Sequence, residues 1–149
     1  MAYHFRLETV LGLRRNLEEL AQQKLGRELT LLEQHKLQLA ELKQQRQELI
    51  AEFEEEKQQQ MLAPIFALFV EGIFRKEQEI EAGQTRVEAQ LGAVAQARVE
   101  LTGKVQDKKV MEKAKERDYQ KFLLAGLKKE QNEADEMMVL RFGRKGNLH

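Results

Sequence analysis

The stretch "QQQMLAPIFALFVEGIFRK", residues 58–76, contains the one proline of this 149-residue chain and its densest apolar run. Eleven of the 14 residues from 61 to 74 are hydrophobic, whereas the flanking stretches consist largely of Glu, Gln, Lys, Arg and Leu. Proline in a helix interior costs about 3 kcal/mol, because it removes a hydrogen bond and clashes with the preceding turn. Pro64 therefore predicts a break between two long helices.

The composition favours helices throughout. Charged residues make up 34% of the chain and aromatic residues only 6%, and there is no cysteine. Such a composition is typical of long helices and coiled coils, and the lack of cysteine excludes disulfides and thiolate metal sites. Residues 1–16 lack the apolar core of a signal peptide, and residues 61–74 are too few for a bilayer span of about 20 residues. We expect an intracellular, soluble, all-α protein without direct membrane insertion.

Apolar residues recur with a heptad period on both sides of the proline. Before it they include Leu25, Leu32, Leu39 and Phe53, and after it Ile73, Ile80, Val87, Val94 and Leu101. A period of 3.5 residues means that each helix packs against a partner along one seam. We predict an antiparallel coiled-coil hairpin that forms one domain over residues 1–149. Its parts are a helix over about 3–60, a turn over about 61–65 that reverses at Ala63–Pro64, a helix over about 66–142 that overhangs the first, and a flexible tail over 143–149.

Charged residues suggest the register of the seam. If facing residue numbers sum to 126, three pairs of opposite charge coincide, namely Arg14 with Glu112, Glu18 with Lys108, and Glu28 with Arg98. Sums of 119 or 133 also align the heptads, but unpaired ions are expensive to bury, so the pairs penalise these slipped registers. The same sum places Phe53 opposite Ile73, and His35 opposite Leu91.

The apolar run at the turn has two interpretations. In this register Phe66 faces Gln60 and Val70 faces Glu56, so the first helix supplies little apolar cover for the phenylalanines at 66, 69 and 74. One interpretation is that Met61, Leu62 and Ile65 fold back and seal the turn. The other is that the phenylalanines form an exposed surface for a protein partner.

Catalysis has no support in the sequence. His4, His35 and His149 share no helix face with a nucleophile, and no glycine-rich phosphate loop is present, so we expect no enzyme activity and no cofactor. Residues 104–129 carry nine Lys/Arg against four Asp/Glu. The net charge of zero and the interspersed acids nevertheless argue against a nucleic-acid partner.

Three stretches resemble one family. They are "FRLETVLGLRRNLEELAQQKL" at 5–25, "KKVMEKAKERDYQKF" at 108–122 and "EQNEADEMMVLRF" at 130–142. In this order they resemble the flagellar export protein FliJ family over the whole length. Ala-Asp-Glu at 134–136 stands where Leu-Asp-Glu is usual, which is a departure from the family pattern.

The resemblance implies a stalk similar to the γ subunit of rotary ATP synthases. The paired terminal ends would enter the pore of the hexameric export ATPase, and the turn would contact the membrane export gate. Freed export chaperones would be escorted to their substrates by a monomer that is cytoplasmic and peripheral to the inner face of the membrane at the flagellar base. The expected ATPase contacts are Leu7, Leu11, Arg14, Asp135, Glu136 and Arg141, and the expected gate contacts are Leu49, Phe53, Phe66, Phe69 and Ile73.

Two alternatives stay open at this point. A stalk protein of injectisome (virulence) secretion would have the same fold, and a generic coiled-coil scaffold, for example a homodimer, would have the same composition.

Overall fold

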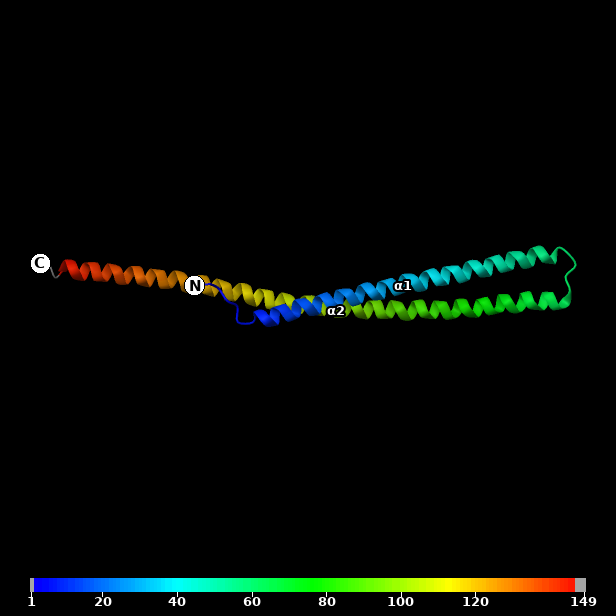
Figure 1. Ribbon diagram of the computed structural model, residues 1–149, viewed down its shortest axis with the longest axis horizontal. Helices are drawn as coiled ribbons and strands as arrows, with labels where there is room; N and C mark the ends of the chain where they lie inside the picture. Colours follow the sequence, from blue (N-terminus) through cyan, green and yellow to red (C-terminus); the bar gives the residue numbers. More distant parts are fainter. Residues whose placement is uncertain (1, 147–149) are drawn as a thin grey trace. The chain divides into compact units, whose positions relative to one another are not determined.

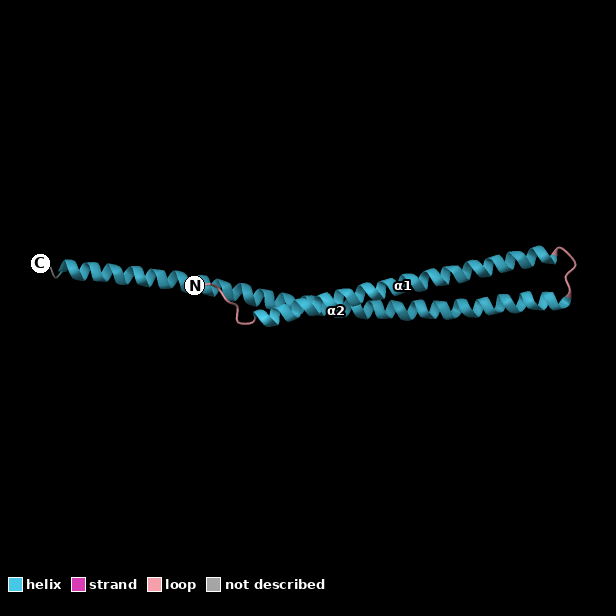
Figure 2. Ribbon diagram, viewed as in Figure 1, coloured by secondary structure: helices cyan, strands magenta, loops and turns pink. Residues whose placement is uncertain are grey.

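The computed structural model describes residues 2–146, with side chains up to residue 144. It contains two helices, α1 (Glu8–Lys57) and α2 (Ala63–Gly146), which run antiparallel and pack against each other (Figure 1). No strand occurs among the described residues (Figure 2). The predicted all-α class and the antiparallel hairpin are therefore confirmed.

The reversal lies earlier in the chain than the sequence suggested. α1 ends at Lys57, residues 58–62 are not helical, and α2 begins at Ala63, so Pro64 is the second residue of α2. The backbone amides of Ile65 and Phe66 both donate to the carbonyl of Leu62, at 3.0 and 3.1 Å. Proline is tolerated here because the first amides of a helix have no intrahelical acceptor. Pro64 thus starts the second helix instead of making the turn.

The far end of α2 also differs from the expectation. The helix continues to Gly146, beyond the predicted end at 142, so part of the expected tail is helical. Residues 147–149, which include His149, lie outside the described residues.

One compact unit, here called unit 2, comprises Glu19–Gly103. Its buried apolar side chains are Ala21, Leu32, Phe53, Val94 and Ala97. Gly83 permits close packing of the helices, because a Cβ atom at this position would lie 3.2 Å from Cδ1 of Leu39. The ion pairs Lys24–Glu100 (3.1 Å) and Arg46–Glu77 (2.9 Å) cross the same seam.

These contacts correct the predicted register. The pairs Lys24–Glu100, Arg46–Glu77 and Phe53–Phe69 have residue numbers that sum to 122–124 instead of 126. The shift of roughly one helical turn follows from the earlier reversal. Accordingly Glu28 is bonded to Gln90, whose Nε2 donates to the Glu28 carbonyl oxygen at 2.9 Å and also to its carboxylate. Among the described residues Glu28 and Arg98 form no ion pair, so that predicted pair is wrong.

His35 lies in the same seam. The His35 residue is half-buried, and its Nδ1 is the one buried side-chain nitrogen or oxygen without a hydrogen-bond partner among the described residues. An unsatisfied polar atom of this kind costs stability, which is consistent with a tolerated polar residue at a seam position.

The second compact unit, unit 1, comprises Met1–Glu18 and Lys104–His149. Its core contains Phe5 and Leu11. The predicted pair of Glu18 with Lys108 is present as an ion pair. Arg14 instead donates from Nη1 to the backbone carbonyl of Asp107 at 2.7 Å, and it forms no ion pair with Glu112 among the described residues.

The C-terminal part of α2 has no partner helix. Every side chain from 123 to 144, here called the C-terminal extension, is exposed. Its large apolar residues are Leu123, Leu124, Leu127, Met137, Met138, Val139, Leu140 and Phe142. The predicted overhang of the second helix is therefore present.

Candidate protein-binding surfaces

The first candidate surface lies at the turn of unit 2. The tip, here residues 61–74 with Leu49 and Phe53, contains the five expected gate contacts. The Phe53 ring packs against the rings of Phe66 and Phe69, with centroids 5.3 and 5.1 Å apart. Leu49 approaches Gly72, next to Ile73, where an added Cβ would lie 3.3 Å from its Cδ2. The structure thus packs Phe66 and Phe69 against a buried Phe53 and brings Leu49 close to the backbone beside Ile73.

The tip does not close over its own apolar side chains. Leu62 is 70% exposed, Ile65 is 42% exposed and Phe66 is 47% exposed. Phe74, Leu68 and Val70 are exposed as well. Of the residues that were expected to seal the turn, only Met61 is half-buried. The interpretation in which these residues seal the turn is not what the structure shows.

Lys57, which the sequence did not single out, contacts the Phe53 ring of the tip. The Nζ atom of Lys57 lies 4.0 Å from the centroid of the Phe53 ring and 3.2 Å from Oε1 of Glu54. A cation over an aromatic face is attracted by the ring quadrupole. The four-residue spacing of Phe53 and Lys57 on one helix was the signal that could have revealed this contact.

The second candidate surface is formed by unit 1. Leu11 is fully buried, so it supports the seam and is inaccessible to a partner while the two helices stay packed. Leu7 and Arg14 are half-buried. Asp135, Glu136 and Arg141 are all exposed on the C-terminal extension. The structure therefore does not bring the six expected ATPase contacts into one cluster among the described residues.

An aromatic cluster fastens the segment before α1 to α2. The Tyr3 ring lies 5.0 Å from that of Tyr119 in an edge-to-face arrangement and 5.2 Å from that of Phe122. The Tyr3 hydroxyl donates to Oδ2 of Asp118 at 2.9 Å. Burial, followed by this hydrogen bond, raises the pKa of Tyr3 to about 12. The phenol therefore stays protonated and donating at neutral pH.

Two ion pairs reinforce the same unit. The hydrogen bond from Lys115 to Glu8, at 2.9 Å, lowers the pKa of the Glu8 carboxyl. The hydrogen bond to Glu18 raises the pKa of Lys108. Both pairs favour the charged forms of their members at neutral pH.

The comparisons with known proteins follow this geometry. The family model described as Flagellar FliJ protein matches residues 3–147. The chain belongs to this family. A solved structure described as a putative YscO homolog, CT670 from Chlamydia trachomatis, has a TM-score of 0.74 and 20% identity, and the match covers 93% of this chain and 94% of that one. This likeness shows the fold. A search of curated proteins gave no match.

Within this FliJ-family chain the described residues hold no group of three His, Cys, Asp or Glu that could bind a metal ion. In the same part of the chain no helix is long and apolar enough to cross a membrane. The features that stand out are therefore surfaces: the tip, the C-terminal extension and the aromatic cluster of Tyr3. Tyr3 was missed because facing residue numbers that sum to 126 place Leu7, and not Tyr3, opposite Tyr119.

Proposed function

We propose that this FliJ-family chain is a non-enzymatic stalk component of the flagellar type III protein export apparatus. The terminal unit binds the hexameric export ATPase, the tip binds the membrane export gate, and the monomer escorts export chaperones. The observation that carries the proposal is that one FliJ-family chain presents two separate exposed apolar surfaces, the tip and the C-terminal extension.

The C-terminal extension is suited to a partner that surrounds it. Five of the six residues at 137–142 are large and apolar, and all are exposed. A helix that is apolar around its whole circumference is normally buried on all sides. Most of the stability of a helix in a protein comes from packing of its apolar side chains, which the extension lacks. A pore lined by ATPase subunits would supply contacts on every side, with Asp135, Glu136 and Arg141 at its polar positions.

The tip is suited to a groove on a partner. Phe66 and Phe69 rest on the buried Phe53, so this part of the surface is held in place before a partner arrives. Burying one such side chain contributes about 1.5–3 kcal/mol, and aromatic residues often dominate interfaces. The export gate, on the cytoplasmic side of the membrane at the flagellar base, is the partner that we assign to it.

The ATPase assignment is tested by stimulation of the purified hexamer. We expect Met138→Ser with Phe142→Ser to reduce the stimulated ATPase rate by at least about tenfold, since two buried apolar contacts of about 1.5 kcal/mol each would be lost. The matched control is Leu37→Ser, because Leu37 is an equally exposed leucine of unit 2. Full stimulation by the double variant would refute the assignment.

The injectisome alternative calls for a different observation. The match to the Flagellar FliJ protein family favours the flagellar system. If the gene for this chain lay next to genes for virulence secretion and not next to flagellar genes, the injectisome system would be favoured.

A further inference from the structure

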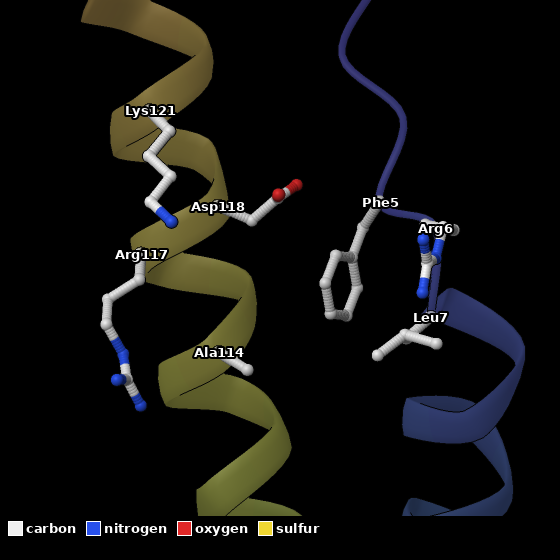
Figure 3. A pocket seen from close by; sticks show the side chains of 7 residues that line it. All are labelled: Phe5, Arg6, Leu7, Ala114, Arg117, Asp118 and Lys121. Atoms are coloured by element: carbon white, nitrogen blue, oxygen red, sulfur yellow. The ribbon is translucent and has the colours of Figure 1, made fainter.

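A pocket of about 430 Å³ lies in unit 1 between the segment before α1 and the face of α2 (Figure 3). Its apolar floor is formed by Phe5, Leu7 and Ala114. Figure 3 shows the Phe5 ring projecting from its segment toward α2. Phe5 is only 6% exposed, so the floor is fixed by packing. The volume falls in the usual range for small binding sites.

Three cations also line the pocket, namely Arg6, Arg117 and Lys121. None of them forms an ion pair or hydrogen bond within the part of the chain that the structure describes. By contrast, Lys108 and Lys115 of the same helix are paired with Glu18 and Glu8.

The spacing of two of these exposed cations favours a bound anion. Arg117 and Lys121 are four residues apart on α2, which places two like charges on neighbouring positions of one helix face. Like charges at this spacing repel each other and weaken the helix slightly. A bound anion would remove this cost.

The one acid in the pocket is already engaged. Asp118 accepts the hydroxyl hydrogen of Tyr3 at 2.9 Å, and Figure 3 shows its carboxylate directed toward the segment before α1. This hydrogen bond, with the Tyr3–Tyr119 ring contact, holds Phe5 and Arg6 beside α2. Asp118 thus shapes the pocket and does not neutralise its cations.

We propose that this pocket binds an acidic peptide segment that carries one large apolar side chain. The apolar side chain would occupy the floor, and carboxylates would pair with Arg6, Arg117 and Lys121. Arginine suits this role because its planar fork matches a carboxylate. A nucleic-acid backbone or a lipid surface would use the cations but would leave the concave apolar floor empty. The site rests on the geometry of unit 1 and extends beyond the ATPase assignment.

The test uses the full-length chain and a fluorescein-labelled peptide, Asp-Glu-Leu-Glu-Asp, in an anisotropy titration at moderate salt. We expect saturable binding, weakened at least about tenfold by Arg117→Glu with Lys121→Glu, since the variant loses two charge-assisted hydrogen bonds to the peptide carboxylates and adds two repelling charges. The control is Lys128→Glu with Lys129→Glu, which makes the same change of charge on α2 outside the pocket. This control should shift Kd by less than about twofold at moderate salt, where distant charges are screened.

Two further peptides separate the pocket from simple charge attraction. Replacing the peptide leucine by serine should weaken binding about fivefold or more, because the floor is then unfilled. A Lys-Lys-Leu-Lys-Lys peptide should not bind. The milder variant Arg117→Gln with Lys121→Gln should also weaken binding. Unchanged helicity by circular dichroism would show that this loss does not come from misfolding.

Three outcomes would overturn the proposal. They are no binding of the acidic peptide at millimolar concentration, equal binding by the Arg117 and Lys121 variants, and stronger binding to phosphatidylglycerol vesicles or single-stranded DNA through the same two residues. All three are independent of whether the chain stimulates an ATPase, so this proposal and the proposed function can fail separately.

Discussion

The tip and the C-terminal extension both expose large apolar side chains, but they differ in what supports these side chains. At the tip, Phe66 and Phe69 rest on Phe53 of α1, which is 6% exposed. In the extension, Met137 and Phe142 project from a single helix without a partner helix. Exposure alone therefore does not define a binding surface. The support beneath it decides whether the surface is formed before a partner binds.

This difference has an energetic consequence. The helices of unit 2 are stabilised by side chains buried in their seam, whereas the extension has no such seam among the described residues and depends on helix propensity. Local opening free energies follow such differences in burial. We infer that the tip is formed before any partner binds, and that a partner of the extension would stabilise its helix further.

The largest expected effect is on the free energy of unfolding, and it compares a side chain that supports the tip with a side chain of the extension. Phe53→Ala removes the ring beneath Phe66 and Phe69 and should lower the free energy of unfolding by about 3 kcal/mol, as large core truncations do. Phe142→Ala, at a position that is 69% exposed, should change it by less than about 0.5 kcal/mol. Urea denaturation followed by circular dichroism measures both. Similar losses for the two variants would mean that the extension is packed as firmly as the seam.

A smaller effect compares two glycines. Gly126, near the start of the extension, has open space around it, so Gly126→Ala should stabilise the helix by about 1 kcal/mol through propensity alone. At Gly83 a new Cβ would meet Leu39 at 3.2 Å, and the displacement of that leucine should offset most of this gain. Amide hydrogen exchange around each glycine, together with the melting temperature, measures the change in helix stability for the two variants. An equal gain at Gly83 would show that the helices of unit 2 are less closely packed than the structure indicates.

The smallest effect concerns pH. The pairing with Lys115 lowers the pKa of Glu8 in the folded state, so the stability that this pair provides is fully present above the ordinary glutamate pKa. It is lost as the pH falls through the lowered folded-state pKa. The melting temperature of the native chain should therefore fall slightly more between about pH 5 and pH 3 than that of Glu8→Gln. Identical pH profiles would show that the pair contributes nothing measurable.

The sequence predicted the helical hairpin well because heptads and a single proline restrict the possibilities strongly. It misplaced the register because Pro64 is equally acceptable in a turn and in the first turn of a helix. The charge pairs did not correct this error. The long side chains of Glu18 and Lys108 meet in the observed register as well, although the pair was selected for a different one. Register in a two-helix seam depends on the length of the connection, which composition does not fix.

The candidate surfaces were predictable in part. Leu49, Phe53, Phe66, Phe69 and Ile73 were expected near the turn, and the structure places them there. Lys57 and Tyr3 were missed, since a cation–π contact and the position of a non-helical segment leave little periodic signal. Leu11 was expected as a contact and is instead fully buried, because apolar heptad positions look alike whether they face a partner helix or another protein.

The most direct test of two separable surfaces is a paired binding measurement with full-length variants. Phe66→Ser alters an exposed side chain of the tip, and Leu140→Ser alters one of the extension. Each variant is titrated against the purified hexameric export ATPase and against the cytoplasmic part of the export gate. We predict that Phe66→Ser weakens gate binding at least about tenfold with ATPase binding unchanged, and that Leu140→Ser does the reverse, as loss of one buried apolar anchor implies. If either variant weakened binding to both partners equally, or weakened binding to neither, the assignment of two independent surfaces would be contradicted.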